Sequence, residues 1–308
     1  MGKINTVSLI GLGAIGAAYG SKLHLLLGDS LTVVANEERI QRYEDTGLNV
    51  NSETYHFHYQ ISDTAAAPAD LVIFAVKNAE LDQAIEEIGH HIGPNTIILS
   101  LLNGISSEEI IKEATGNEHV LYSMCVGIDA QRNGTSIHYG NLGRICYGEQ
   151  NQSVSEDVLA VKELFNEAGI SYEIPDDIKH SVWAKFMFNV GINQTSAVLQ
   201  APYSIFQNIP AAYDLALAAM YEVVTISKKV GVHLTEEDVK QYTPVLHLLS
   251  PKGKTSMLQD IEANRKTEVE YFAGKVCEIG KEFGVPTPVN EQLYKIIHVK
   301  EEIAKYRR

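Results

Sequence analysis

The chain has few cysteines and no long apolar run. Cys125, Cys146 and Cys277 are odd in number, widely spaced and set in apolar surroundings. This pattern argues against a disulfide framework and a zinc site, and it indicates buried free thiols in a reducing compartment. No apolar run approaches the roughly 20 residues that span a bilayer, and the N-terminus shows no signal-peptide pattern. We therefore expect a cytoplasmic protein without a membrane-spanning segment.

Basic side chains are also scarce. The 25 Lys and Arg residues stand against 39 Asp and Glu residues, which gives a formal net charge of -14. A surface of this charge repels polyanions, so the sequence argues against nucleic acid and an anionic membrane as main partners. A local group of Lys, Asn and helix ends can still attract a small acid. The histidines form no ligand set with the cysteines, so we expect no metal site.

The most informative motif is a glycine-rich turn near the N-terminus. An apolar run of strand type leads directly into Gly11, Gly13 and Gly16 and then into a helix-forming segment. Although glycines also mark ordinary turns, this context favours a dinucleotide, with the phosphates at the helix N-terminus. Gly11 would permit the tight turn, Gly13 the approach of the pyrophosphate, and Gly16 close packing of the helix on the strand. The expected cofactor loop consists of Gly11, Leu12, Gly13, Ala14, Ile15 and Gly16.

The first half of the chain alternates between strand and helix patterns. Expected strands lie at 31–35, 48–61 (an exposed pair), 70–77, 96–104, 119–129, 136–140, 143–149 and 170–176. Expected helices begin at Glu37 and cover 81–92 and 155–169. Continuous apolar strands with helical crossovers are typical of parallel sheets covered on both faces. We predict an α/β fold, a Rossmann-type doubly wound sheet with some antiparallel members, over residues 1–174.

The second half reads as helix throughout. Helical periodicity covers 176–199, 210–231, 235–249 and 256–284, and Pro175 with the following Asp pair suits a helix start. We therefore predict an all-α C-terminal domain over residues 175–308. On the expected helix at 256–284, one polar side would carry Ser256, Gln259, Asp260, Asn264 and Glu268. That stripe alone decides nothing, because exposed ion pairs on helices are common and contribute little.

Two groups of polar residues are candidates for chemistry. Lys185, Asn189 and Asn193 are four residues apart, so they share one face of an apolar helix. A solvated face would explain them as well, but buried polar groups need partners or a ligand. Lys77 and Asn103 close two apolar strands, and the carboxyl ends of parallel strands face the crevice where such sheets bind ligands.

These motifs together resemble one enzyme family. GLGAIG at 11–16, AVK ending at Lys77, LLNG ending at Gly104, WAKFMFNVGIN at 183–193 and SMLQDIEANRKTEVEYFAG at 256–274 are similar to the ketopantoate reductase family, 2-dehydropantoate 2-reductase. The resemblance covers nearly the whole chain in the right order. It depends most on the blocks in the helical half, because they are not a general Rossmann signature.

The resemblance implies an oxidoreductase that reduces 2-dehydropantoate to (R)-pantoate with NADPH, on the route to pantothenate and coenzyme A. Lys185 takes the place of the family's general acid. Asn189 and Asn193 match substrate-binding positions, and Ser256 matches a position near the substrate carboxylate. Glu268, the second expected catalytic residue, matches one that binds the substrate hydroxyl and supports the active site. Asn103 and Lys77 match residues near the nicotinamide and ribose, and Asn103 is expected to bind the substrate as well. The implied partner is a small 2-oxo acid, and the sequence leaves the oligomeric state open, with a homodimer among the alternatives.

The cofactor-specifying segment departs from the family pattern. NADPH-using members often place Arg where this chain has Asn36, and Glu37 and Glu38 would repel a 2'-phosphate. No acid stands at the strand end for a ribose diol, and Arg39 lies within reach of a phosphate. We expect NADPH, with NADH as the alternative.

Two other functions remain open at this point. Relatives with this architecture resemble NAD-dependent D-2-hydroxyacid dehydrogenases that act on branched or aromatic 2-oxo acids. A non-catalytic nucleotide-binding sensor is the alternative from another class. The joint presence of Lys185, Glu268 and both Asn residues argues against a sensor, because a sensor needs only the glycine loop and its surroundings.

Overall fold

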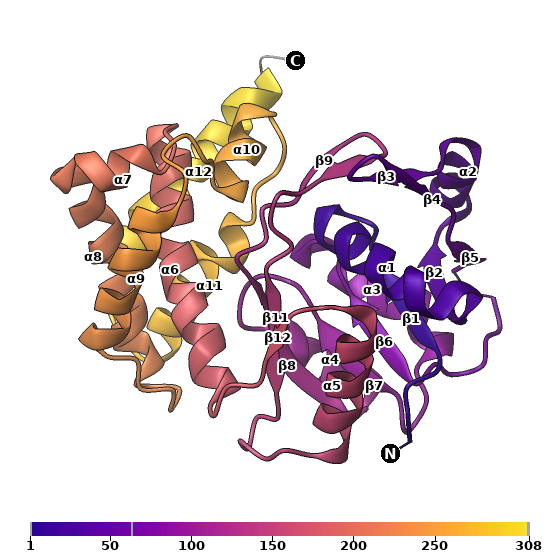
Figure 1. Ribbon diagram of the computed structural model, residues 1–308. Coiled ribbons are helices and arrows are strands. Elements are labelled where there is room, and N and C mark those ends of the chain that lie inside the picture. Colours follow the sequence, from indigo (N-terminus) through magenta and orange to yellow (C-terminus); the bar gives the residue numbers. More distant parts are fainter. Residues whose placement is uncertain (1, 63, 307–308) are drawn as a thin grey trace. The chain divides into compact units, whose positions relative to one another are not determined.

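The computed structural model describes residues 2–62 and 64–306 of the chain. The chain divides into two compact units, Met1–Ile178 and Lys179–Arg308. The boundary that we expected, between residues 174 and 175, lies slightly before this division. Figure 1 shows both units and labels most of the helices and strands named below.

The first unit is built on an eight-stranded sheet. Its strand order is β12-β11-β8-β7-β6-β1-β2-β5. The strands are β1 (Val7–Ile10), β2 (Leu31–Ala35), β5 (His58–Ile61), β6 (Leu71–Phe74), β7 (Ile97–Ser100), β8 (Val120–Val126), β11 (Arg144–Gly148) and β12 (Tyr172–Glu173). Neighbouring strands from β5 to β8 are parallel, and β11 is antiparallel to β8. The predicted doubly wound α/β fold is confirmed.

Helices cover both faces of this sheet, which explains the continuous apolar strands. They are α1 (Ala14–Leu27), η1 (Gly28–Ser30), α2 (Glu37–Thr46), η2 (Asn78–Glu80), α3 (Leu81–Ile88), η3 (Gly89–His91), α4 (Ser107–Thr115) and α5 (Glu156–Ala168). Leu9 of β1 packs in a core with Leu23 of α1 and Phe165 of α5. Its neighbour Ile10 points to the opposite face and packs with Ile85 of α3. Since successive strand residues face opposite sides, every residue of β1 is buried.

A second, smaller sheet has the strand order β4-β3-β10-β9. Its strands are β3 (Leu48–Val50), β4 (Glu53–Tyr55), β9 (Gln131–Asn133) and β10 (Ser136–His138). The exposed strand pair expected at 48–61 is therefore three strands, two of them in this sheet, and β9 was missed. The antiparallel β9 and β10 are joined across Gly134, whose φ of 62° suits glycine. β10 in turn pairs with β3, and Arg132 of β9 contacts Leu12 of the glycine loop.

The second unit is helical, as predicted. Its helices are α6 (Ile178–Leu199), α7 (Ser204–Asn208), α8 (Pro210–Ser227), α9 (Glu236–Leu248), α10 (Ser256–Glu262), η4 (Val269–Tyr271), α11 (Ala273–Glu282) and α12 (Pro288–Tyr306). Gly191 of α6 lies close to α8, because a Cβ at this position would be 2.7 Å from the Ala216 carbonyl oxygen. The core of the unit therefore depends on a small residue in the middle of its longest helix.

The single helix predicted at 256–284 is wrong. The chain leaves α10 at Ala263, and Asn264 adopts a φ of 53°, which interrupts a right-handed helix. Asp260 stabilises the break, since its backbone oxygen accepts from Arg265 N and its carboxylate pairs with Arg265 Nε at 2.8 Å. Ser256 and Glu268 therefore do not lie on one face of one helix.

Candidate cofactor and substrate sites

The glycine turn after β1 has no room for side chains at two of its three glycines. Gly11 has a φ of 98°, and a Cβ there would be 2.6 Å from the carbonyl carbon and oxygen of Ala75. A Cβ at Gly16 would collide with the Gly11 carbonyl oxygen. These contacts hold the start of α1 tightly against the turn, as the sequence motif predicts.

Gly13 differs from its two neighbours, because space remains around it. A Cβ there would meet nothing closer than the Ala75 oxygen at 3.8 Å. Gly13 is the N-cap of α1, and no side chain caps the helix. The first amides of a helix lack intrahelical partners and carry the positive end of the dipole, so they attract an anion. The turn therefore fits the pyrophosphate of a dinucleotide.

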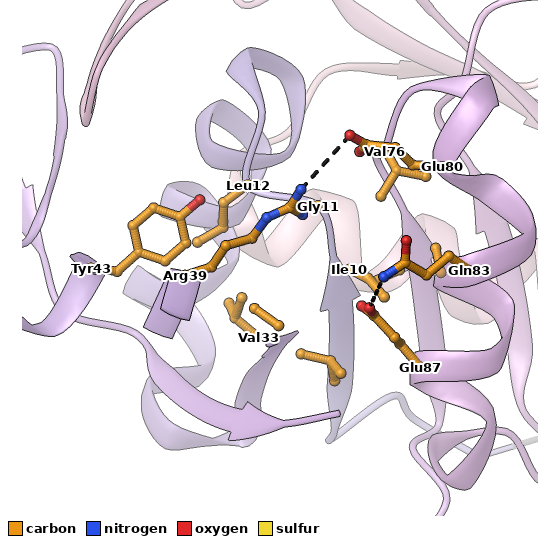
Figure 2. Close-up of a pocket in the computed structure, with 13 residues that line it drawn as sticks. Ile10, Gly11, Leu12, Val33, Arg39, Tyr43, Val76, Glu80, Gln83 and Glu87 are labelled. Carbon is orange, nitrogen blue, oxygen red and sulfur yellow. Dashed lines mark hydrogen bonds and ion pairs between the residues drawn. The ribbon is translucent and has the colours of Figure 1, made fainter. Parts of the chain in front are cut away.

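A pocket adjoins the glycine turn at the carboxyl ends of β1 and β2 (Figure 2). Its lining residues are Ile10, Gly11, Leu12, Val33, Val34, Ala35, Arg39, Tyr43, Val76, Glu80, Gln83, Ala84 and Glu87. An ion pair of 3.7 Å joins Arg39 Nη2 to Glu80 Oε1. Gln83 Nε2 donates to Glu87 Oε1 at 2.6 Å. The pocket thus adjoins the glycine turn where β1 and β2 end, and both signs of charge line it.

Asn36, expected at the cofactor site, is the N-cap of α2. Its Oδ1 accepts a hydrogen bond from Arg39 N at 2.9 Å. This bond fixes the first turn of α2 and places Arg39 beside the pocket. Glu37 and Glu38 are exposed in the same turn. Asn36 therefore has a structural role as the cap of α2, whether or not it contacts a cofactor.

Lys77 and Asn103 lie beyond the strands that we expected them to close. β6 ends at Phe74 and β7 at Ser100, and the two strands are neighbours in the sheet. Lys77 is exposed and is the N-cap of η2. Asn78, which the sequence analysis missed, is buried, and its Nδ2 donates to the Asn103 backbone oxygen at 2.8 Å. This bond joins the two segments that follow neighbouring strands.

Arg132 of β9 is a second residue that the sequence analysis missed. Its Nη1 donates to the Leu12 backbone oxygen in the glycine loop, and its Nη2 donates to Tyr43 Oη at 3.3 Å. The guanidinium carbon lies 5.8 Å from the centre of the Tyr43 ring. Arg132 therefore connects the small sheet to the loop, a contact that sequence spacing does not reveal because 120 residues separate its two ends.

In the second unit, the stripe predicted on α6 is present and largely buried. Lys185 is half-buried, whereas Asn189 and Asn193 are only 9% and 7% exposed. Within residues 2–62 and 64–306, neither of these two amides makes a hydrogen bond. Neither amide is among the fully buried polar atoms that lack a partner, so the amide ends of both side chains reach accessible surface. Because the two residues are otherwise buried, an ordinary solvated helix face explains them less well than a ligand-facing one.

Glu268 and Ser256 belong to segments on either side of the break after α10. Ser256 is the exposed first residue of α10, and Glu268 is half-buried and precedes η4. The rings of Phe186 and Phe272 are 6.2 Å apart, and Ala273 N donates to Gln194 Oε1 at 2.9 Å. These two contacts pack the segment after Glu268 against the α6 helix that carries Lys185.

A buried acid lies beneath the loop that carries Asn103. Glu108 on α4 accepts from Ser107 Oγ at 2.9 Å and from Ser123 N at 3.2 Å. Burial raises the pKa of the Glu108 carboxyl to about 7, although these hydrogen bonds oppose the shift. Its folded pKa thus lies above the unfolded value, so its stabilisation is complete below about pH 4.5 and is lost as pH rises through 7.

Glu108→Gln should remove this pH dependence. Between pH 4.5 and pH 8.5 we expect the variant to gain about 3 kcal/mol of unfolding free energy relative to wild type, because the amide stays neutral. Urea unfolding at both pH values measures this difference. Glu113 is an exposed acid on the same helix, so Glu113→Gln is the matched control. It should change the pH dependence of the unfolding free energy little. Parallel pH profiles for wild type and Glu108→Gln would contradict the interpretation.

The described residues contain neither a candidate metal site nor a membrane-spanning helix. Within residues 2–62 and 64–306, no group of three or more His, Cys, Asp or Glu side chains could hold a metal ion. Over the same residues, no helix is both long and apolar enough to cross a bilayer. Cys125 and Cys146 are buried, Cys277 is half-buried, and among the described residues none of the three forms a disulfide.

Comparison with known proteins gives matches along most of the chain. The family model described as ketopantoate reductase PanE/ApbA matches residues 7–152, and its C-terminal counterpart matches residues 177–301. The 2-dehydropantoate 2-reductase of Streptococcus pyogenes serotype M3 (strain ATCC BAA-595 / MGAS315) is 26% identical over 301 residues, which are 96% of this chain and 98% of the relative.

A second relative and a solved structure have similar coverage. The uncharacterized oxidoreductase YkpB of Bacillus subtilis (strain 168) is 27% identical, over 95% of this chain and 98% of the relative. The ternary structure of D-mandelate dehydrogenase with NADH and anilino(oxo)acetate superposes with a TM-score of 0.86 at 22% identity, over 97% of this chain and 99% of that chain. At that identity, the similarity shows the fold.

Proposed function

This chain belongs to the ketopantoate reductase family, and on that premise we propose that it reduces 2-dehydropantoate to (R)-pantoate with NADPH. The product serves pantothenate and coenzyme A synthesis, and three cysteines that form no disulfide among the described residues suit a cytoplasmic enzyme. One observation carries the proposal. Asn189 and Asn193, both largely buried and without hydrogen bonds among the described residues, share a helix face with Lys185. Such a face suits a small polar substrate better than it suits a core.

The residues of the first unit would bind the cofactor. Gly11 and Gly16 shape the turn and Gly13 leaves space for the pyrophosphate, with Leu12, Ala14 and Ile15 completing the loop. Asn36 and Arg39 would bind the adenosine ribose and its phosphate, and Lys77 and Asn103 would lie near the nicotinamide ribose. When bound, the cofactor supplies the hydride. The protein's part is to hold the dinucleotide along the edge of the sheet.

Lys185 would act as the general acid. As a ketone carbon accepts hydride, negative charge grows on its oxygen, and a nearby ammonium stabilises that charge and gives the proton. The half-buried position of Lys185 suits this role, because electrostatic interactions strengthen where water is partly excluded. After the transfer, the proton is on the new hydroxyl of pantoate and the amine is neutral.

The other polar residues of the second unit would hold the substrate. The two asparagines would donate to and accept from its polar atoms, Ser256 would contact the carboxylate, and Glu268 would accept from the hydroxyl. A carboxylate that accepts from a substrate hydroxyl contributes about 1.5–3 kcal/mol. In these roles Glu268 orients the substrate, whereas Lys185 takes part in the chemistry.

Glu268→Ala should therefore raise KM for ketopantoate about tenfold or more, with a smaller effect on kcat. Steady-state kinetics at saturating NADPH measure both constants. Glu262→Ala removes another acid nearby in the chain, one that pairs with Lys254 at 2.8 Å, and should leave KM unchanged. Unaltered kinetics in Glu268→Ala, together with a lowered melting temperature, would make Glu268 a structural residue.

A second candidate function is an NADH-dependent D-2-hydroxyacid dehydrogenase. One observation favours it, namely that Asn36 stands where a phosphate-binding Arg is common and its oxygen is used to cap α2. Glu80 and Glu87 add negative charge to the pocket lining. Both features disfavour a 2'-phosphate. The two functions share hydride transfer to a 2-oxo acid but differ in cofactor and side-chain preference.

Steady-state rates with two cofactors and two substrates would separate these functions. The purified protein is assayed at 340 nm with NADPH or NADH and with ketopantoate or 2-oxoisovalerate. The highest kcat/KM with NADPH and ketopantoate is the expected result. A preference for NADH and 2-oxoisovalerate would support the second candidate, and cofactor binding without any turnover would support a sensor.

A further inference from the structure

One ion pair of the first unit crosses the pocket beside the glycine turn. In Figure 2, the Arg39 side chain extends from α2 past Leu12 and Gly11 toward Glu80 on the opposite wall. The measured separation is 3.7 Å between Nη2 and Oε1. We propose that Glu80 is a specificity-determining residue for the cofactor, because NADPH must draw Arg39 away from Glu80 whereas NADH need not. This inference rests on the proposed function, since it takes the pocket as the adenosine site.

The Arg39–Glu80 pair is weak enough to exchange partners. The two side chains are 46% and 48% exposed, and exposed pairs typically contribute little to stability because water screens them. A phosphate dianion offers Arg39 a stronger, bidentate partner than one carboxylate oxygen at this distance. The guanidinium can therefore leave Glu80 when a phosphate arrives, and the energy needed to break the ion pair with Glu80 lowers the affinity for NADPH.

Arg39 is also the cation best placed for a 2'-phosphate. Among the described residues that line the pocket, it is the only basic one. Its backbone N–H is bonded to Asn36 in the first turn of α2, so the side chain starts at the carboxyl end of β2. Arg132, the other guanidinium nearby, is bonded to the Leu12 oxygen and Tyr43. A phosphate on the ribose would thus compete with Glu80 for Arg39.

The opposite wall supplies a natural comparison. Glu87 lines the same pocket with the same charge, but it accepts from Gln83 Nε2 at 2.6 Å instead of pairing with Arg39. Removing its charge lowers the general repulsion of a phosphate without releasing Arg39. Comparing the loss of charge at Glu80 with the loss of charge at Glu87 therefore distinguishes two effects. One is competition for the Arg39 guanidinium, and the other is the overall charge of the pocket.

Titration calorimetry of NADPH and NADH tests the inference by binding alone. Glu80→Gln should tighten NADPH binding about fivefold and change NADH binding less than about twofold. Glu87→Gln should change both less than about twofold. In an Arg39→Gln background, the added Glu80→Gln substitution should lose most of its effect on NADPH, because the guanidinium that it releases is gone.

The outcomes separate this inference from the proposed function. Equal tightening by Glu80→Gln and Glu87→Gln, or equal effects on NADPH and NADH, would overturn the role of Glu80 and leave the proposed activity standing. Persistence of the Glu80→Gln effect without Arg39 would overturn it as well. Failure of wild-type protein to bind either dinucleotide would overturn the proposed function together with the inference.

Discussion

Lys185→Ala is expected to lower kcat with ketopantoate and NADPH about a hundredfold or more, the usual scale for loss of a positioned general acid. The dissociation constant of NADPH should change less than about twofold, because Lys185 belongs to the second unit and the cofactor loop to the first. The loss should fall on kcat and kcat/KM alike, since the ammonium matters most once charge has grown on the carbonyl oxygen.

Lys179→Ala is the matched control for this experiment. Lys179 lies on the same helix, but it is six positions before Lys185, a step that places it on a different face. Its replacement should leave kcat nearly unchanged. Equal kcat values for Lys185→Ala and wild type would remove Lys185 from the mechanism, and the sensor or a different acid would then have to be considered.

Gly16→Ala is expected to destabilise the protein by about 3 kcal/mol and to abolish measurable NADPH binding. Its Cβ would collide with the Gly11 carbonyl oxygen and come within 3.0 Å of the Ala75 Cβ. Backbone cannot move aside as the end of a flexible side chain can, so α1 would be pushed away from the turn. Overpacking of this kind commonly costs about 1–3 kcal/mol. Urea unfolding and calorimetry measure the two effects.

Gly13→Ala in the same loop should have a different result. The φ of -68° and ψ of -167° at Gly13 suit alanine, and its Cβ would have open space. We therefore expect stability within about 0.5 kcal/mol of wild type but NADPH binding weakened about tenfold or more, since the added methyl stands where the pyrophosphate must approach. Normal NADPH affinity in Gly13→Ala would show that the phosphates bind elsewhere.

The sequence was sufficient for the features that depend on short spacing. The strand, turn and helix around Gly11 and Gly16 follow from local sterics that a six-residue motif encodes. The stripe of Lys185, Asn189 and Asn193 follows from the helical period, although only the structure shows that both asparagines are largely buried and make no hydrogen bond with the described residues.

Features that depend on one residue's backbone or on distant pairing could not be predicted in this way. Asn264 breaks the helical pattern by adopting a positive φ, and the bonds that support it come from Asp260 and Arg265 together. Helical periodicity alone does not register such a break, because the polar residues after it continue at plausible steps.

The sequence also could not predict contacts that depend on pairing between distant segments. Arg132 contacts the glycine loop only because β10 pairs with β3, and the Arg39–Glu80 pair forms only because β6 lies next to β1 in the sheet. Strand order, and not local sequence, determines both contacts.

A crystal structure of the protein with NADP⁺ and pantoate would test the central claim most directly. The quantity to measure is the distance from Lys185 Nζ to the hydroxyl oxygen that was the ketone of the substrate. We expect about 2.6–3.2 Å, with the nicotinamide C4 facing the carbon that bears this oxygen. Pantoate bound with its hydroxyl beyond reach of the Lys185 amine, and another group donating to that oxygen, would contradict the account.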